Sequence, residues 1–150
     1  MEAGSPITAY GGTAAQLDLS LEYSAAGEEL PVVHLSGEFD IDTVPEIDRF
    51  LRRRLGPFYH RRHLILDLEG VRFIDSAFLG YVVTLVTRLH GHGKELLVTR
   101  PRGSVRQILA AVGLPNVVPV YDSIEEGVEI LASGRLPVIP PAFSASSARL

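Results

Sequence analysis

Apolar and polar residues follow two different periods along the chain, and their succession predicts both strands and helices. Five short segments have the alternation or the apolar composition of strands: 17–21, 31–36, 64–68, 96–98 and 117–121. The segment 17–21 alternates apolar and polar residues, as a half-buried strand does, whereas 64–68 is nearly all apolar, as a strand covered on both faces should be. Pro119 lies inside the last segment, which indicates a strand at the edge of the sheet.

Between these strands, apolar residues recur at spacings of three and four, which indicates helices. The predicted helices carry the stripes Val44, Ile47, Leu51 and Leu55; Leu79, Val82, Val86 and Leu89; Val105, Ile108, Leu109 and Val112; and a last segment from 124 to about 132. Thr43 and Ser123 are each followed three residues later by glutamate, which is the pattern of a capping box at a helix start. Glycine follows each predicted helix and ends it.

The resulting order, β-β-α-β-α-β-α-β-α, predicts an α/β fold. Strands that are joined through a helix must run parallel with right-handed crossovers, whereas the first two strands are joined by a turn and are antiparallel. We therefore predict a mixed sheet of four to five strands with helices packed on it. The folded domain spans 16–132, residues 1–15 are interpreted as a flexible Gly-rich arm, and 133–150 as a disordered Pro-rich tail.

Composition and charge narrow the classes of function. The length of 150 residues suits one domain, and 46% hydrophobic with 21% charged residues excludes a disordered chain, a collagen-like fibre and a coiled coil. A net charge of −4 gives no electrostatic reason to expect nucleic acid or a membrane surface as the main partner. The chain has no cysteine, no secretory signal pattern and no apolar stretch near the ~18 residues of a membrane span, so we expect a cytoplasmic protein.

Two polar loops follow predicted strands and precede predicted helices. One is the run 37–40, and the other is the pair Asp75 and Ser76. Because both loops leave the carboxyl ends of parallel strands, we expect them at the same end of the sheet, where functional residues gather in such folds. Asp75 or Ser76 must lie at the start of a helix, and the residues alone favour a simple capping role for the pair.

These loops and their surroundings carry a resemblance to a known family. The runs LSGEFD, LILDLEGVRFIDSAFLG, VRQILAAVGL and VVPVYDSIEEGVEIL follow one another in the family's order over nearly all of 16–132. The chain thus resembles a STAS domain of the bacterial anti-sigma factor antagonist (anti-anti-sigma factor) type. The resemblance implies a regulator of sigma-factor-dependent transcription without catalytic activity or a cofactor. Its unphosphorylated form would bind an anti-sigma factor with serine kinase activity, phosphorylation of Ser76 would release it, and a serine phosphatase would reset it.

The resemblance also implies a partner-facing surface. Its residues would be Glu38, Asp40, Thr43, Asp75, Ser76, Ala77, Phe78 and Gly80. Two positions depart from the family's pattern. Ala77 stands where a second serine or threonine is common, so Ser76 is the single acceptor. Phe78 stands where glycine is frequent, and it belongs either to the partner interface or to the core.

Other functions stay open at this point. A STAS scaffold or sensor could bind another protein or a small ligand without being phosphorylated. Asp40 and Asp75 could act as an acid and a base, although no G-x-S-x-G elbow and no histidine accompany them in either loop.

Histidines and arginines elsewhere suggest weaker alternatives. His90 and His92 lack the spacing and further ligands of a metal site. A local basic surface is formed by Arg52, Arg53, Arg54, Arg61 and Arg62. It could attract an acidic partner or RNA, but a solvated helix face is the simpler interpretation in a chain of negative net charge.

Overall fold

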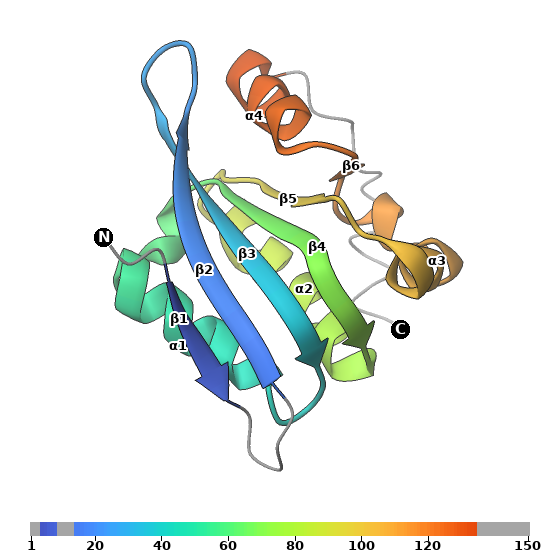
Figure 1. Ribbon diagram of the computed structural model, residues 1–150. Helices are drawn as coiled ribbons and strands as arrows, with labels where there is room; N and C mark the ends of the chain where they lie inside the picture. Colours follow the sequence, from blue (N-terminus) through green and yellow to red (C-terminus); the bar gives the residue numbers. More distant parts are fainter. Residues whose placement is uncertain (1–3, 9–13, 135–150) are drawn as a thin grey trace.

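The framework is a mixed β-sheet in a computed structural model that describes residues 4–8 and 14–134 (Figure 1). Its strands lie in the order of the chain: β1 (Gly4–Thr8), β2 (Ala14–Tyr23), β3 (Glu29–Phe39), β4 (Leu64–Ile74), β5 (Leu96–Thr99) and β6 (Val120–Tyr121). The pairs β1–β2 and β2–β3 are antiparallel, and the remaining pairs are parallel. The predicted α/β class and the alternation of strands and helices are confirmed.

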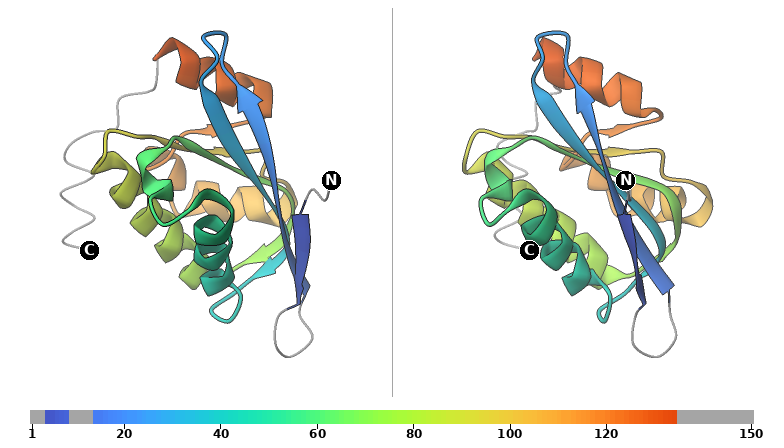
Figure 2. Two further views of the ribbon diagram at one scale, coloured as in Figure 1. Left: turned by 90° about the vertical axis from the view of Figure 1, so that its left-hand side faces the viewer. Right: turned by 60° about the vertical axis from the view of Figure 1, so that its left-hand side comes forward.

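Helices cover both faces of this sheet (Figure 2). They are α1 (Val44–Leu55), α2 (Ser76–His90), α3 (Gly103–Ala111) and α4 (Ile124–Ser133), with short 3-10 turns η2 (Tyr59–Arg61) and η3 (Leu114–Asn116). The main core lies between the sheet and α1, α2 and α3. A smaller core on the opposite face packs Leu131 of α4 against Val32, Ile65 and Leu97. The period-two alternation along β3 and β4 thus supplies apolar side chains to both faces.

The ends of the sheet differ from the prediction. The structure has an additional strand, β1, inside the segment interpreted as a flexible arm. Its backbone pairs with the edge of β2, and the sequence there has no alternation of apolar and polar residues from which a strand could be predicted. The predicted strand 117–121 is wrong in extent, since only Val120 and Tyr121 pair with β5 and Val118 is buried in the core. The predicted edge position next to Pro119 is confirmed. The expected tail lies, from residue 135 on, outside the described residues.

Strands β3 and β4 are longer than predicted and run well beyond β5. Each has 11 residues, whereas β5 has 4 and pairs with β4 only up to Asp67. Their close approach depends on Gly70, because a Cβ there would lie 2.6 Å from the Ser36 Cβ and 3.2 Å from the Ser36 Cα. The β3–β4 register shifts at this point, between His34 and Ser36. The extended pair carries the two polar loops away from the body of the sheet.

Replacing Gly70 with alanine is expected to destabilise the protein by about 1–3 kcal/mol, because β3 and β4 must move apart to admit the methyl group. Gly80 is the matched control, since a Cβ in that helical position meets open space. Gly80→Ala should raise stability by up to about 1 kcal/mol through helix propensity. Urea unfolding measures both, and equal effects from the two substitutions would contradict a close approach at Gly70.

Candidate functional site

The two polar loops meet at one end of the sheet, as predicted. Strand β3 ends at Phe39 and β4 ends at Ile74, and these two residues are partners in the parallel register. Asp40 and Asp75 therefore begin adjacent loops, visible where the arrowheads of β3 and β4 lie side by side in Figure 1. Helix α2 starts directly at this end of the sheet.

Asp75 is the N-cap of α2. Its Oδ1 accepts hydrogen bonds from the backbone N–H groups of Ala77 at 2.9 Å and Phe78 at 3.2 Å. Ser76 is the first residue of the helix, its side chain is exposed, and its hydroxyl has no hydrogen-bond partner in the described part of the chain. The capping role thus falls on Asp75 alone, and the Ser76 hydroxyl takes no part in it.

Replacing Asp75 with alanine is expected to lower the free energy of unfolding by about 1 kcal/mol, since two N–H groups of α2 lose their acceptor. Asp75→Asn is the matched variant, because an asparagine side chain also caps helices well. Thermal unfolding of the two variants measures the difference. A loss of equal size in both would assign the effect to the charge of Asp75 rather than to its hydrogen bonds.

The loop after β3 is held by its own side chains. Asp40 Oδ1 accepts from the backbone N–H groups of Asp42 at 2.9 Å and Thr43 at 3.1 Å. The Thr43 hydroxyl donates to the Glu38 carbonyl oxygen at 3.0 Å and accepts from the Asp40 N–H at 2.9 Å. The predicted capping box at Thr43 is therefore wrong, because its hydroxyl is engaged within the loop and makes no cap bond. At Ser123 the predicted N-cap is confirmed, with the Glu126 N–H donating to the Ser123 hydroxyl, which is one of the two hydrogen bonds of a capping box.

Two of the residues predicted for this surface have internal roles. Thr43 is buried and braces the loop, and Phe78 is 0% exposed. The Phe78 ring lies 6.1 Å from the ring of Phe39, centroid to centroid, within the main core. Of the two interpretations of Phe78, the structure supports the core, so neither Phe78 nor Thr43 offers a surface to a partner. Ala77 is half-buried.

Exposed apolar side chains lie beside the polar ones at this end of the sheet. Ile41 in the loop after β3 is 72% exposed, and Phe73 near the end of β4 is 47% exposed. Phe73 is the register partner of Glu38, which in turn approaches Arg72 at 3.9 Å. Exposed apolar residues with a charged rim are typical of protein–protein contact sites. Sequence reasoning missed both residues, because only the full length of β3 and β4 determines which apolar side chains face outward.

Asp40 and Asp75, the two carboxylates considered as an acid and a base, are each hydrogen-bonded within their own turn. Each carboxylate accepts backbone N–H groups of its own turn, which is a structural use of the charge. Within residues 4–8 and 14–134, no group of three or more His, Cys, Asp or Glu side chains could hold a metal ion. No helix in the same ranges is long and apolar enough to cross a membrane.

A comparison with known families decides the identity of the fold. The sequence model of the STAS domain matches residues 25–127. The chain belongs to the STAS domain family. The predicted resemblance is thereby confirmed, and the matched range contains both polar loops and all of α1, α2 and α3.

Curated relatives of this STAS domain are bacterial regulators. The chain is 29% identical over 96 residues to an anti-sigma F factor antagonist of Paenibacillus polymyxa, covering 61% of this chain and 78% of the relative. It is 30% identical over 95 residues to an anti-sigma-B factor antagonist of Staphylococcus aureus (strain NCTC 8325 / PS 47), covering 62% of this chain and 84% of the relative.

Solved structures share the STAS fold. An anti-sigma factor antagonist from Mycobacterium paratuberculosis superimposes with a TM-score of 0.60 at 22% identity, covering 77% of this chain and 93% of that one. The phosphorylated form of the Bacillus cell fate determinant SpoIIAA superimposes with a TM-score of 0.52 at 22% identity. The match covers 73% of this chain and 96% of that one. At these identities the likeness concerns the fold.

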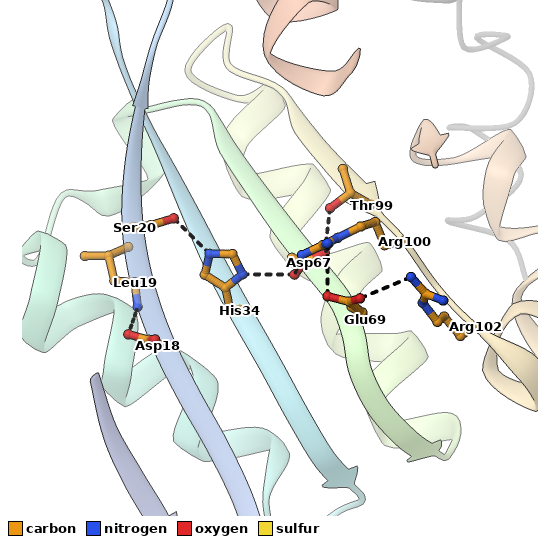
Figure 3. A network of polar contacts seen from close by, with 9 residues as sticks. All are labelled: Asp18, Leu19, Ser20, His34, Asp67, Glu69, Thr99, Arg100 and Arg102. Carbon is orange, nitrogen blue, oxygen red and sulfur yellow. Dashed lines mark hydrogen bonds and ion pairs between the residues drawn. The ribbon is translucent and has the colours of Figure 1, made fainter. Parts of the chain in front are cut away.

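A polar network ties together four segments of the STAS sheet (Figure 3). At its centre, Asp67 is 3% exposed and accepts two hydrogen bonds from Arg100, at 2.9 and 2.8 Å, and one from Thr99 at 3.1 Å. His34 donates from Nδ1 to Asp67 at 2.9 Å, because an ionised carboxylate can only accept, and its Nε2 shares a hydrogen bond of 2.8 Å with the Ser20 hydroxyl. Sequence reasoning missed this network, although a carboxylate inside the apolar run 64–68 was its signal.

The series Ser20, His34, Asp67 has the order of a hydrolase triad, but its surroundings fit a structural tie. Ser20 lies within the paired part of β2, opposite Val32, and not at a turn or a helix start that would present backbone N–H groups to an oxyanion. Asp67 is already neutralised by the two-pronged contact with Arg100. Arg100 has a φ of 55° and is the one described residue other than glycine with a positive φ.

The network makes stability depend on pH through Asp67. Burial alone would raise the pKa of Asp67, but hydrogen bonds from His34 and Arg100, the charge of Arg100 and the Thr99 hydroxyl together hold that pKa well below its ordinary value of 3.8. A carboxyl whose pKa is lower in the folded than in the unfolded state stabilises the fold above its unfolded pKa. The contribution disappears as the pH falls through 3.8 toward the folded value.

We therefore expect the free energy of unfolding to fall by on the order of 2 kcal/mol as the pH is lowered from about 5 to 2 on account of Asp67. Asp67→Asn should be less stable than the parent near neutral pH and should lose less stability on acidification. Urea unfolding across this pH range measures both slopes. Parallel curves for the two proteins would show that Asp67 does not carry the acid dependence.

Proposed function

We propose that the chain is an anti-sigma factor antagonist that regulates sigma-factor-dependent transcription by binding, without catalysis of its own. In this proposal the unphosphorylated protein binds an anti-sigma factor with serine kinase activity. Phosphorylation of Ser76 then releases the complex, and a serine phosphatase resets the protein. The observation that carries the proposal is the exposed, unbonded hydroxyl of Ser76 at the start of α2.

The comparisons support this proposal at two levels. The relatives from Paenibacillus polymyxa and Staphylococcus aureus are named as anti-sigma factor antagonists. SpoIIAA, which shares the fold, has been solved in an unphosphorylated and in a phosphorylated form. A covalent phosphate is therefore compatible with this fold. In the present chain, the residue after Ser76 is Ala77, which has no hydroxyl group, so Ser76 is the proposed phosphate acceptor in this loop.

The proposed contact surface is centred on Ser76 and includes the exposed and half-buried residues around it. From the predicted set we retain Glu38, Asp40, Asp75, Ser76, Ala77 and Gly80, and we add Ile41 and Phe73. Ile41 and Phe73 would supply apolar contact area, while the carboxylates would supply orientation through charge. Thr43 and Phe78 support this surface from beneath.

A pull-down from native cell extract tests the proposal. The baits are the parent protein, Ser76→Ala and Ser76→Asp, and circular dichroism first establishes that each is folded. Ser104→Asp is the matched control, because Ser104 is also exposed and lies in the first turn of α3. We expect the parent, Ser76→Ala and Ser104→Asp to retain an ATP-binding kinase that Ser76→Asp does not retain. Equal recovery by all four baits would overturn the phosphorylation switch and favour a STAS scaffold that is not phosphorylated.

A further inference from the structure

A second cluster of basic side chains lies at the end of the molecule opposite Ser76. Both α1 and α2 follow the carboxyl end of a strand and run back along the sheet, so their C-terminal ends lie together, far from the Ser76 loop. There, Arg52 of α1, His60 of η2, Arg88 of α2 and His92 line a cavity of about 320 Å³. Only Arg52 among them belongs to the basic surface predicted from the sequence.

One carboxylate serves both arginines of this cavity. Asp48 accepts from Arg52 Nε at 2.7 Å and from Arg88 Nη1 at 3.2 Å, and it also accepts from the Tyr59 hydroxyl. Arg88 Nη1 further donates to the Tyr59 oxygen at 2.8 Å. A guanidinium carries more N–H donors than these bonds use. The remaining donors of Arg52 and Arg88 have no acceptor in the part of the chain that the structure describes.

The two imidazoles add further positive charge when they are protonated. The rings of His60 and His92 lie 4.6 Å apart, centroid to centroid. Burial lowers the pKa of His60, and the charges of His92, Arg61, Arg52 and Arg88 lower it further. The charges that act on His60 thus oppose its protonation, while Asp48, the carboxylate of this cluster, is already bonded to Arg52 and Arg88.

We propose that this cavity binds a small tetrahedral oxyanion with two negative charges, namely phosphate or the phosphomonoester group of a small molecule. Guanidinium groups match the geometry of phosphate oxygens, and two of them with two imidazoles surround the cavity from three segments of the chain. The C-terminal ends of α1 and α2 carry partial negative charge, so side chains and not helix dipoles provide the attraction. The site is independent of Ser76 and of the proposed release mechanism.

Sulfate is the probe for the first experiment, because it keeps two negative charges across the pH range in which histidine titrates. NMR follows the imidazole resonances of all 5 histidines while sulfate replaces chloride at constant ionic strength. We expect saturable shifts of His60 and His92, pKa values for both that rise when sulfate is bound, and tighter binding near pH 6 than near pH 8. His34, His63 and His90, which do not line the cavity, should change little.

Matched variants separate a built site from general attraction of anions. His92→Gln and Arg52→Gln remove lining residues, whereas His90→Gln and Arg53→Gln remove exposed neighbours of the same type outside the cavity. The first pair should weaken sulfate binding about tenfold, and the second pair should leave it within twofold or so. Shifts that do not saturate, or equal losses in all four variants, would overturn the proposal.

A second titration identifies the source of the anion. Inorganic phosphate and a nucleoside monophosphate are compared on the parent protein and on His92→Gln. Tighter binding of the nucleoside monophosphate would assign the site to an organic phosphomonoester, and tighter binding of inorganic phosphate would assign it to the free ion. Binding of either that is unaffected by His92→Gln would contradict a role for the cavity.

Discussion

Phosphorylation of Ser76 is expected to weaken binding of the anti-sigma partner by about a thousandfold, equivalent to about 4 kcal/mol, while the fold stays intact. In the free protein, the N-terminus of α2 favours an anion by about 0.3–1 kcal/mol. The nearby carboxylate of Asp75 opposes it, since unit charges ~4 Å apart repel by about 1 kcal/mol in water. These two effects nearly cancel, so the stability of the free protein should change little.

In the complex, the balance differs because the phosphate would be removed from water. The phosphate group adds a charge of about −1.5 to −2 at neutral pH to a surface that already carries the carboxylates of Glu38, Asp40 and Asp75. Burying this charge beside the apolar side chains Ile41 and Phe73 is costly, because Arg72, the one basic residue in the runs 37–43 and 71–80, already approaches Glu38. Desolvation and repulsion therefore act together against the complex.

Isothermal titration calorimetry on the kinase recovered by the pull-down measures this effect. The parent protein is compared before and after modification by that kinase, and Ser76→Ala serves as the form that cannot be modified. We expect the unmodified parent and Ser76→Ala to bind alike. A phosphorylated parent that binds as tightly as the unmodified one would refute the switch, and a fall in melting temperature by many degrees would show that the phosphate acts on the fold.

Phe78→Ala is expected to lower the free energy of unfolding by about 3–5 kcal/mol, because the ring is fully buried and its removal leaves a cavity against Phe39. Phe78→Leu keeps most of the volume and should lose less than about 1.5 kcal/mol. Phe73→Ala is the matched control, since Phe73 is 47% exposed and its removal should change stability by no more than about 0.5 kcal/mol. Urea unfolding compares the three variants.

The same variants separate core from contact surface. Phe78→Leu should bind the partner as the parent does, whereas Phe73→Ala should bind more weakly because it removes exposed apolar contact area. If Phe78→Leu changed binding and Phe73→Ala did not, the proposed contact surface would be wrong. A small stability loss in Phe78→Ala would likewise contradict the packing seen beneath the Ser76 loop.

Sequence periodicity alone determined most of the fold of this STAS domain. The alternation at 17–21, the apolar run at 64–68 and the helical stripes that begin at Val44 and Leu79 are local signals, since each reports which face of one element is buried. The chain order of strands and helices then determined that β3 and β4 run parallel, which places the loops at Asp40 and Asp75 at one end of the sheet. Ser76 as the proposed phosphorylation site came from the family resemblance together with this order.

Only the tertiary structure determined the extent of the strands and the roles of individual side chains. Strand β1 exists because the edge of β2 offers backbone partners, and the full length of β3 and β4 rests on an approach that Gly70 permits. Thr43 does not cap α1 because its hydroxyl bonds to the Glu38 carbonyl oxygen. Phe78 belongs to the core because its ring packs near the ring of Phe39.

The two polar clusters likewise join segments that are far apart in the chain. Asp67 meets His34 and Arg100 across neighbouring strands, and Arg52 meets Arg88 and His92 where two helices end together. A pattern along the chain reports burial of single elements, whereas the partner of each buried or charged group is determined only when those elements pack.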